Sequence, residues 1–397
     1  IYGKMTAPAA YLYAKKFYSK AIRENPRLKG KLDLNQKDID RIQYYADAIN
    51  SMEDGYLKDF GVAKMLKVIH DKIPKTLGEK TSMAQTIAQL LNFKTQVRNT
   101  VGNLGLAVAE NAVDTLGVPV DKFASFFTGV RTKTLAGVSP SGLATQAGEG
   151  IRGGIKRIVE AFHGIDTKNL ETKFGLSQSD TFKNVPLKYT ERTLKAMLGG
   201  ADAAFYEAAF ASELKNQMRL ANTLTPTADM VARARRTGLY RTLQDENNYT
   251  KFFSGFKKWL NRGKGFGVGY VVIKYTKTPA NLFKIPIEYS PIGFINSIYK
   301  VARSNGSREE IQRELVDSFT RMGIGTGTIG TGALLSHTNI ITQKKDEPGK
   351  VRGLKKNLGF KDYAINLDAA RRFWDSGLDI NQAKSRPGDK LVTFDWF

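Results

Sequence analysis

Apolar side chains recur every three or four residues along most of this chain, which is the spacing of helices that bury one face. In the N-terminal part, runs of this kind cover about 11–22, 35–55 and 57–73. A longer run over 191–224 is rich in alanine, the strongest helix former, and a further helix is predicted over 227–243. We therefore predict a mainly α fold, built as an elongated assembly of several helices.

Two further predicted helices are rich in small residues. One opens near residue 93, and the other lies within 322–343, a stretch of 22 residues without a charged side chain. Small residues let another helix approach closely, and we expect the first helix to pack tightly in water. The second is long enough to cross a bilayer but weakly hydrophobic, so we expect it to pack in protein and to insert into a membrane later. The candidate helix-packing or membrane-contacting residues are Gly102, Gly105, Gly323, Gly327, Gly330 and Gly332.

The stretch 271–293 is apolar but contains three prolines, which forbid one long regular helix. We expect an extended run that ends at about 277–278, followed by short helices broken at Pro286 and Pro291. Thr278 is a suitable N-cap, and Pro279 fits a first helical turn. A segment this apolar and this kinked favours a contact surface over a catalytic pocket.

Towards the C-terminus the pattern predicts one well-capped helix and a small sheet. Ser307 and Glu310 have the spacing of a capping box. Two alternating runs, 363–367 and 391–396, predict strands that pair antiparallel, with a helical insertion over 368–377.

A change of composition predicts the domain organisation. Glycine, serine, threonine and alanine dominate 129–154, which indicates a linker, or else a loosely held pair of helices. Because the chain starts at Ile1 and stops inside a predicted strand, we also expect a piece of a longer polypeptide. The predicted regions are an N-terminal helical region (1–128), the linker (129–154), a central helical region (155–264) and a C-terminal region (265–397).

The charge of the chain points to its partners. The sequence has 61 Lys and Arg against 38 Asp and Glu, a formal net charge of +23. Such a charge favours nucleic acid, anionic lipid or an acidic protein, although a solubilising surface is the plainer interpretation. Arginines cluster in the predicted helix 227–243, and lysines alternate with aromatic residues over 251–270, where single-stranded nucleic acid, a lipid interface and ordinary packing all stay open. The phosphate-contacting candidates are Arg233, Arg235, Arg236, Arg241, Lys257, Lys258, Arg262 and Lys264.

Catalytic chemistry has little support in the sequence. The chain has no cysteine, and its three histidines lie far apart without a metal-ligand spacing. The glycines of 263–269 follow a predicted helix, which is the wrong context for a nucleotide-binding loop. We find no pairing of a nucleophile with a base. We therefore expect no enzyme, no cofactor and no metal.

Two blocks of the chain carry short motifs in a consistent order. The motif residues are Asn92, Thr95, Arg98, Asn99, Gly102, Asn103, Lys277, Thr278, Pro279, Glu288, Tyr289, Pro291, Asp395 and Trp396. These motifs resemble the large polyvalent protein-associated regions of bacteriophages, found in internal or ejected virion proteins. This chain departs from the pattern by a longer insertion in its last part and by Phe394, where tyrosine is common.

The resemblance implies a phage protein that is carried in the virion and delivered with the genome. We expect a non-enzymatic internal or ejection protein that forms part of a channel or sheath for DNA through the portal and tail or the host envelope. Its expected partners are further copies of itself, other virion proteins such as portal or tail proteins, double-stranded DNA and, during ejection, the host membrane. The alternative is a scaffold segment of a giant phage polypeptide whose enzymatic domain lies outside these residues.

Overall fold

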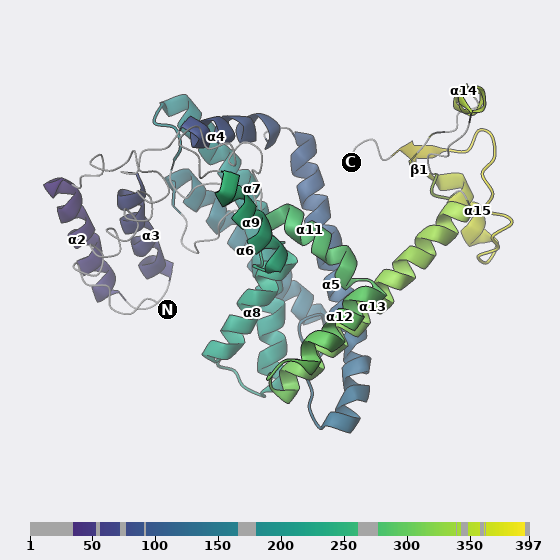
Figure 1. Cartoon of the computed structure of the whole chain (residues 1–397), viewed down its shortest axis with the longest axis horizontal. Coiled ribbons are helices and arrows are strands. Elements are labelled where there is room, and N and C mark those ends of the chain that lie inside the picture. The colour runs from purple at the N-terminus through teal and green to yellow at the C-terminus, as the bar shows by residue number, and fades with distance from the viewer. Residues whose placement is uncertain are drawn as a thin grey trace. The chain divides into compact units, whose positions relative to one another are not determined.

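The computed structural model describes most of the chain beyond residue 34. The described residues are 35–52, 56–71, 77–90, 93–165, 180–260, 277–338, 340–342, 348–357, 361 and 363–393. They form a mainly helical structure with a two-stranded antiparallel sheet near the C-terminus, as the sequence predicts (Figure 1). The predicted helix over 11–22 lies outside the described residues.

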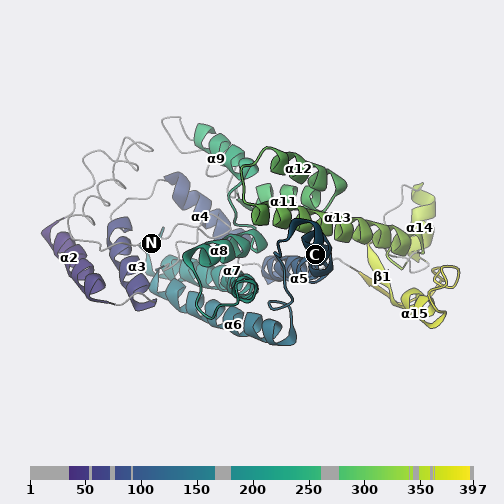
Figure 2. The same ribbon diagram turned by 90° about the horizontal axis from the view of Figure 1, so that it is seen from below.

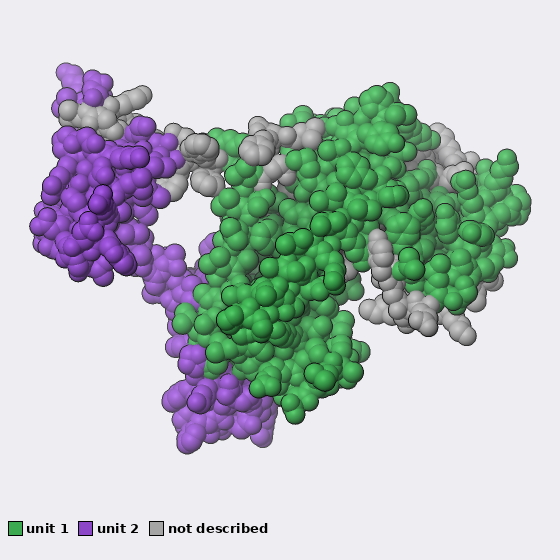
Figure 3. Space-filling view, turned by 180° about the vertical axis from the view of Figure 1, so that it is seen from behind, with its two compact units in different colours: residues 1–118, 133–285 green, residues 119–132, 286–397 purple. Residues whose placement is uncertain are grey.

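The chain divides into two compact units, coloured separately in Figure 3. The first contains 1–118 and 133–285, and the second contains 119–132 and 286–397. Residues 119–132 therefore belong to the same unit as residues 286–397, which are far along the chain.

The first unit is built from helices. Two of them, α5 and α11, continue past the unit boundary, and Pro119 lies inside α5. The helices are α2 (Gln36–Ser51), α3 (Tyr56–His70), α4 (Leu77–Leu90), α5 (Phe93–Thr128), α6 (Pro140–His163), α7 (Val185–Leu220), α8 (Ala228–Arg241), α9 (Asn248–Leu260) and α11 (Lys277–Glu288).

Residues 140–154, predicted as a linker or else as part of a loosely held pair of helices, form the first part of α6, a regular helix that packs along α7 (Figure 2). Ser139 caps its start, Pro140 occupies its first turn, and Gly164 ends it with a φ of 67°. Three of its glycines, Gly150, Gly153 and Gly154, lie against α7: a Cβ on Gly150 would be 2.9 Å from the carbonyl oxygen of Ala204. The composition that indicated a linker is thus that of a close helix–helix contact.

Small residues also bring α8 against α7, while larger apolar side chains join α4 to it. Gly238 of α8 lies against the ring of Tyr206, and a Cβ there would be 2.7 Å from the ring. Met83 and Leu90 of α4 pack with Leu194 and Leu198 of α7 in a buried cluster. Helix α7 is therefore the element on which α4, α6 and α8 assemble.

The second unit contains a helix pair followed by the small sheet. Helices α12 (Pro291–Ala302) and α13 (Arg308–His337) pack through the rings of Phe294 and Phe319, whose centroids are 5.5 Å apart. The capping box of Ser307 and Glu310 is present at the start of α13, as predicted. None of the described helices combines the length and the apolar character that crossing a membrane requires.

The C-terminal β unit confirms the predicted strand pairing. Strand β1 (Ala364–Asn366) pairs antiparallel with β2 (Leu391–Thr393), and Ile365 lies opposite Val392. Helix α15 (Leu367–Asp375) is the predicted insertion, and α14 (Gly349–Asn357) precedes the sheet. The unit has its own small core of Ile340, Ala369 and Ala383.

The proline-rich stretch departs from the prediction. Helix α11 begins at Lys277, so Thr278 lies inside the helix instead of capping it, and the helix continues through Pro286. Pro286 removes one backbone donor close to the C-terminal end, so the break falls at 289–290, before Pro291 starts α12. The predicted extended run before residue 277 lies outside the described residues.

Candidate functional site

The arginine cluster of α8 is split between the surface and the interior. Arg235 and Arg236 are exposed, and Arg233 is half-buried. Arg241 is buried, with 5% of its side-chain surface exposed. The structure therefore leaves Arg235 and Arg236 available to a polyanion and removes Arg241 from the predicted phosphate-contacting set.

Arg241 is buried because it belongs to an internal ion network. One of its terminal nitrogens pairs with Asp114 of α5, and the other donates to Asn111 at 3.1 Å. Lys133 approaches the same carboxylate at 3.0 Å, and 4% of its side-chain surface is exposed. Two buried cations thus share the Asp114 carboxylate.

The electrostatics of this network keep Asp114 ionised. Burial alone would raise the pKa of Asp114, but the charges of Arg241 and Lys133 outweigh it and hold the pKa well below its usual range. Burial also disfavours the charged form of Arg241, and Asp114 and Glu110 outweigh that effect, so its pKa is raised. Asp114 is therefore a fixed anion and a poor candidate for acid–base work.

A small polar pocket adjoins the network. It is lined by Asp114, Lys133, Thr134, Gly137, Val138, Ser212, Glu213 and Asn216. The Asn216 amide oxygen accepts bonds from the Thr134 backbone and hydroxyl at 2.7 and 2.8 Å. The lining groups are thus largely engaged with one another, and the arrangement serves to hold the 134–138 segment against α7.

A second buried carboxylate fixes a turn in the second unit. Asp121 is fully buried and accepts bonds from the Thr132 backbone, from the Thr132 hydroxyl at 2.6 Å and from Arg131 at 2.9 Å. Gln312 of α13 donates to it at 2.9 Å. Asp121 therefore joins the end of α5 to α13 as a structural anchor. In the described part of the chain no group of three His, Asp or Glu side chains could hold a metal ion.

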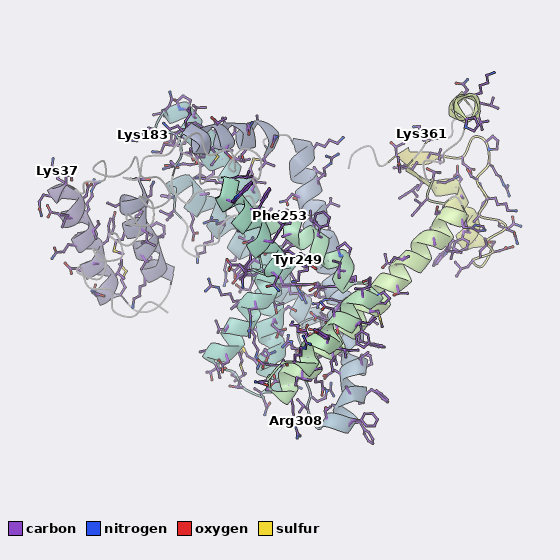
Figure 4. The ribbon with its side chains drawn as sticks, viewed as in Figure 1. Lys37, Lys183, Tyr249, Phe253, Arg308 and Lys361 are labelled. Carbon is purple, nitrogen blue, oxygen red and sulfur yellow. The ribbon has the colours of Figure 1, made fainter. Side chains whose placement is uncertain are left out.

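Helix α9 carries the basic and aromatic residues that the sequence interleaves. Tyr249, Phe252, Phe256 and Trp259 are 46%, 69%, 44% and 59% exposed. Figure 4 labels Tyr249 and Phe253 on this helix. Lys257 is half-buried, whereas the side chain of Lys258 and all of Arg262 and Lys264 lie outside the described part.

The predicted packing glycines have open surroundings. None of the six has another described atom within 4 Å of where its Cβ would be, apart from the backbone of its own helix. No described atom of another helix therefore lies close to these six Cβ positions, whereas Gly150, Gly154 and Gly238 lie against α7. The six are Gly102, Gly105, Gly323, Gly327, Gly330 and Gly332.

Among the motif residues, Asn103 has a definite structural role. It is buried in α5 and donates to Asp202 of α7 at 3.0 Å. Arg98 and Pro291 are exposed, while Asn99, Glu288 and Tyr289 are half-buried. Gly102 is exposed. Asn92, Asp395 and Trp396 lie outside the described residues, as do the side chains of Thr95, Lys277, Thr278 and Pro279.

Sequence reasoning missed the network of Asp114, Lys133 and Arg241. The three residues lie on α5, the following segment and the end of α8, and Asp114 and Arg241 are 127 positions apart. No local spacing connects them, so only the packing of the helices brings them together.

Comparison of the chain with protein-family models, with curated proteins and with solved structures gives no match.

Proposed function

We propose that this chain is a non-enzymatic internal virion or ejection protein of a bacteriophage, which assembles in several copies around DNA and accompanies it towards the host envelope. The observation that carries the proposal is an uncovered apolar row on α6. Ile151, Ile155, Val159 and Phe162 are 64%, 59%, 46% and 44% exposed and share one side of the helix.

The row lies on a different side of α6 from the glycines that pack against α7. A soluble monomer rarely leaves a contiguous apolar row of this kind in water, so the row favours contact with another protein surface. The commonest partner of such a surface is another copy of the same chain. Self-assembly is therefore the simplest use of this face.

The charge and the motifs support the rest of the proposal. The net charge of +23 favours DNA as the polyanion, with the exposed Arg235 and Arg236 as phosphate contacts. The resemblance to phage polyvalent-protein regions supplies the biological setting. Both Asp114 and Asp121 are used as structural anchors, which fits a protein whose polar interior stabilises helices.

The test is the mass distribution of the full chain by mass photometry and light scattering, with and without double-stranded DNA at low salt. We expect assemblies of several copies, and binding to DNA. The double variant Ile151→Asp, Ile155→Asp is expected to be a folded monomer, because two carboxylates cannot be buried unpaired in the contact.

The matched control is Leu224→Asp, at a loop position that is 93% exposed. It is expected to assemble like the unchanged chain. A chain that stays monomeric at all concentrations and does not bind DNA at low salt would overturn the proposal.

A further inference from the structure

Helix α9 presents its four exposed aromatic side chains as a single row. Tyr249, Phe252, Phe256 and Trp259 are spaced by three, four and three residues, so they fall within one narrow arc of the helix, over a length of about 15 Å. Thr250, which is 3% exposed, lies on the side that packs against the protein. The row therefore faces away from the unit.

The same helix is purely cationic. Lys251, Lys257 and Lys258 lie between 248 and 260, and no Asp or Glu occurs there. Lys251 is exposed beside the row. Gly255, also beside it, has no described atom within 4 Å of a would-be Cβ, so no described side chain covers that flank. An exposed aromatic face flanked by positive charge is complementary to a partner that has an apolar interior beneath an anionic surface layer.

The geometry favours a lipid surface over single-stranded nucleic acid. The rings of Phe256 and Trp259 are nearly parallel, at 13° with centroids 5.6 Å apart, so they stack on each other instead of offering separate faces to bases. The phenylalanines have no polar group for a base edge, and the helix has no arginine. Aromatic side chains and lysines together are typical of helices that lie in a membrane interface.

We propose that α9 lies flat in the interface of an anionic lipid bilayer, with the aromatic row at the boundary of head groups and acyl chains and the lysines beside lipid phosphates. At 13 residues, or about 20 Å, the helix is too short to cross the bilayer. This inference deepens the proposed ejection role by giving the membrane contact an element and a lipid chemistry. The inference rests on the proposed function in one respect only, because ejection is the step at which the protein would meet a membrane.

The experiment uses one of the three tryptophans as a local probe. In the full chain carrying Trp374→Phe and Trp396→Phe, Trp259 is the only tryptophan. Its fluorescence is recorded with phosphatidylcholine vesicles and with vesicles that also contain phosphatidylglycerol. We expect a blue shift and quenching by brominated lipid with the anionic vesicles only.

Two variants and a control locate the contact. Lys251→Glu is expected to weaken binding to anionic vesicles by about tenfold or more, because an attraction to the surface becomes a repulsion. Phe252→Ser is expected to weaken it at high salt as well, because it removes apolar contact. The control Phe126→Ser, at an 86% exposed position outside α9, is expected to bind as before. Circular dichroism checks that each variant is folded.

Three results would overturn the inference. The first is an unchanged Trp259 spectrum with anionic vesicles. The second is binding that high salt abolishes and that Phe252→Ser does not alter, because such binding is electrostatic only. The third is a Trp259 response to a single-stranded oligonucleotide but not to vesicles. Because Trp259 reports on α9 alone, failure here is distinguishable from failure of self-assembly through α6.

Discussion

At the scale of single residues, buried charged side chains hold the helices and one turn of the protein together. Arg241 and Lys133 share Asp114, and Asp121 holds a turn through backbone and side-chain donors. Removing one member of such a group leaves the others without compensation in a poorly hydrated site. Individual substitutions here should therefore have effects well above those of surface changes.

The first prediction concerns Asp114→Asn. The variant removes the carboxylate that the buried Arg241 and Lys133 share, and we expect a loss of about 3 kcal/mol in the free energy of unfolding. Urea unfolding followed by circular dichroism measures it. Asp229→Asn changes an exposed acid at the start of α8 and should cost less than about 0.5 kcal/mol. Equal losses in the two variants would contradict the prediction.

The second prediction concerns acid and the C-terminal β unit. Asp389 accepts two bonds from Arg372, at 2.9 and 2.8 Å, and one from the backbone of Arg386 at 2.8 Å. The bonds from Arg372 are the main cause that lowers the pKa of Asp389 below its usual 3.8, with burial acting against them. A lowered pKa stabilises the folded state at pH values above the unfolded pKa, and the stabilisation is lost as the pH falls through the folded value.

Hydrogen exchange of the β1 and β2 amides tests this. We expect full protection above about pH 5 and faster opening as the pH falls below about 4, once the known pH dependence of intrinsic exchange is removed. Asp389→Asn should open more readily at neutral pH and lose this acid dependence. A variant with the acid response of the unchanged chain would show that another group is responsible.

At the scale of elements, two glycines of the same helix have opposite surroundings. Gly150 of α6 lies against the α7 backbone, whereas Gly148, two residues before it, has no described atom within 4 Å. The sequence alone does not separate these cases, since both residues lower helix propensity equally. Their difference comes from the neighbouring helix.

The third prediction uses this pair. Gly150→Ala adds a Cβ 2.9 Å from the Ala204 carbonyl oxygen, so α6 and α7 must move apart, at a cost of about 1–3 kcal/mol. Gly148→Ala fills open space and reduces the freedom of the unfolded chain, so a gain of up to about 1 kcal/mol is expected. Thermal unfolding of both variants compares them directly. Two changes of the same sign would refute the assignment.

Sequence reasoning succeeds where the signal is local. The capping box at Ser307 and Glu310 needs only neighbours three residues apart. The strands β1 and β2 are predicted by the alternation of apolar and polar residues, and a turn signal precedes the second strand. It fails where a residue's role depends on contacts with a distant part of the chain. The glycines of 140–154 pack against α7, and Arg241 is buried because it pairs with Asp114. The exposed arginines of α8 could be named from the sequence, but not separated from the buried one.

At the scale of the whole molecule, the excess of positive charge is the dominant property, and its distribution is testable. If positive charge is spread evenly and creates a uniform field, every exposed cation contributes equally to DNA binding. If α8 forms a contact surface, its exposed arginines contribute more than other cations. The exposed pair Arg235 and Arg236 is suited to this comparison, because neither is part of the internal network.

The fourth prediction is that Arg235→Gln with Arg236→Gln weakens binding to double-stranded DNA and lowers the slope of log K against log salt by about 1 to 2. The control is Arg371→Gln, whose side chain is 82% exposed in the C-terminal unit. It should change the slope by much less. Fluorescence anisotropy over a salt series measures both, and an equal change of slope for each charge removed would indicate a uniform field.

The pairing of Asp114 with Arg241 also sets an order of events during synthesis. The two residues are 127 positions apart, so α5, α6 and α7 leave the ribosome before the arginine exists. Until α8 follows, Lys133 is the buried cation beside the acid on α5, and Tyr206 of α7 lacks its contact with Gly238. The first unit is thus closed by its later helices, and a nascent chain that stalls before residue 241 would leave the protein open to proteases and chaperones.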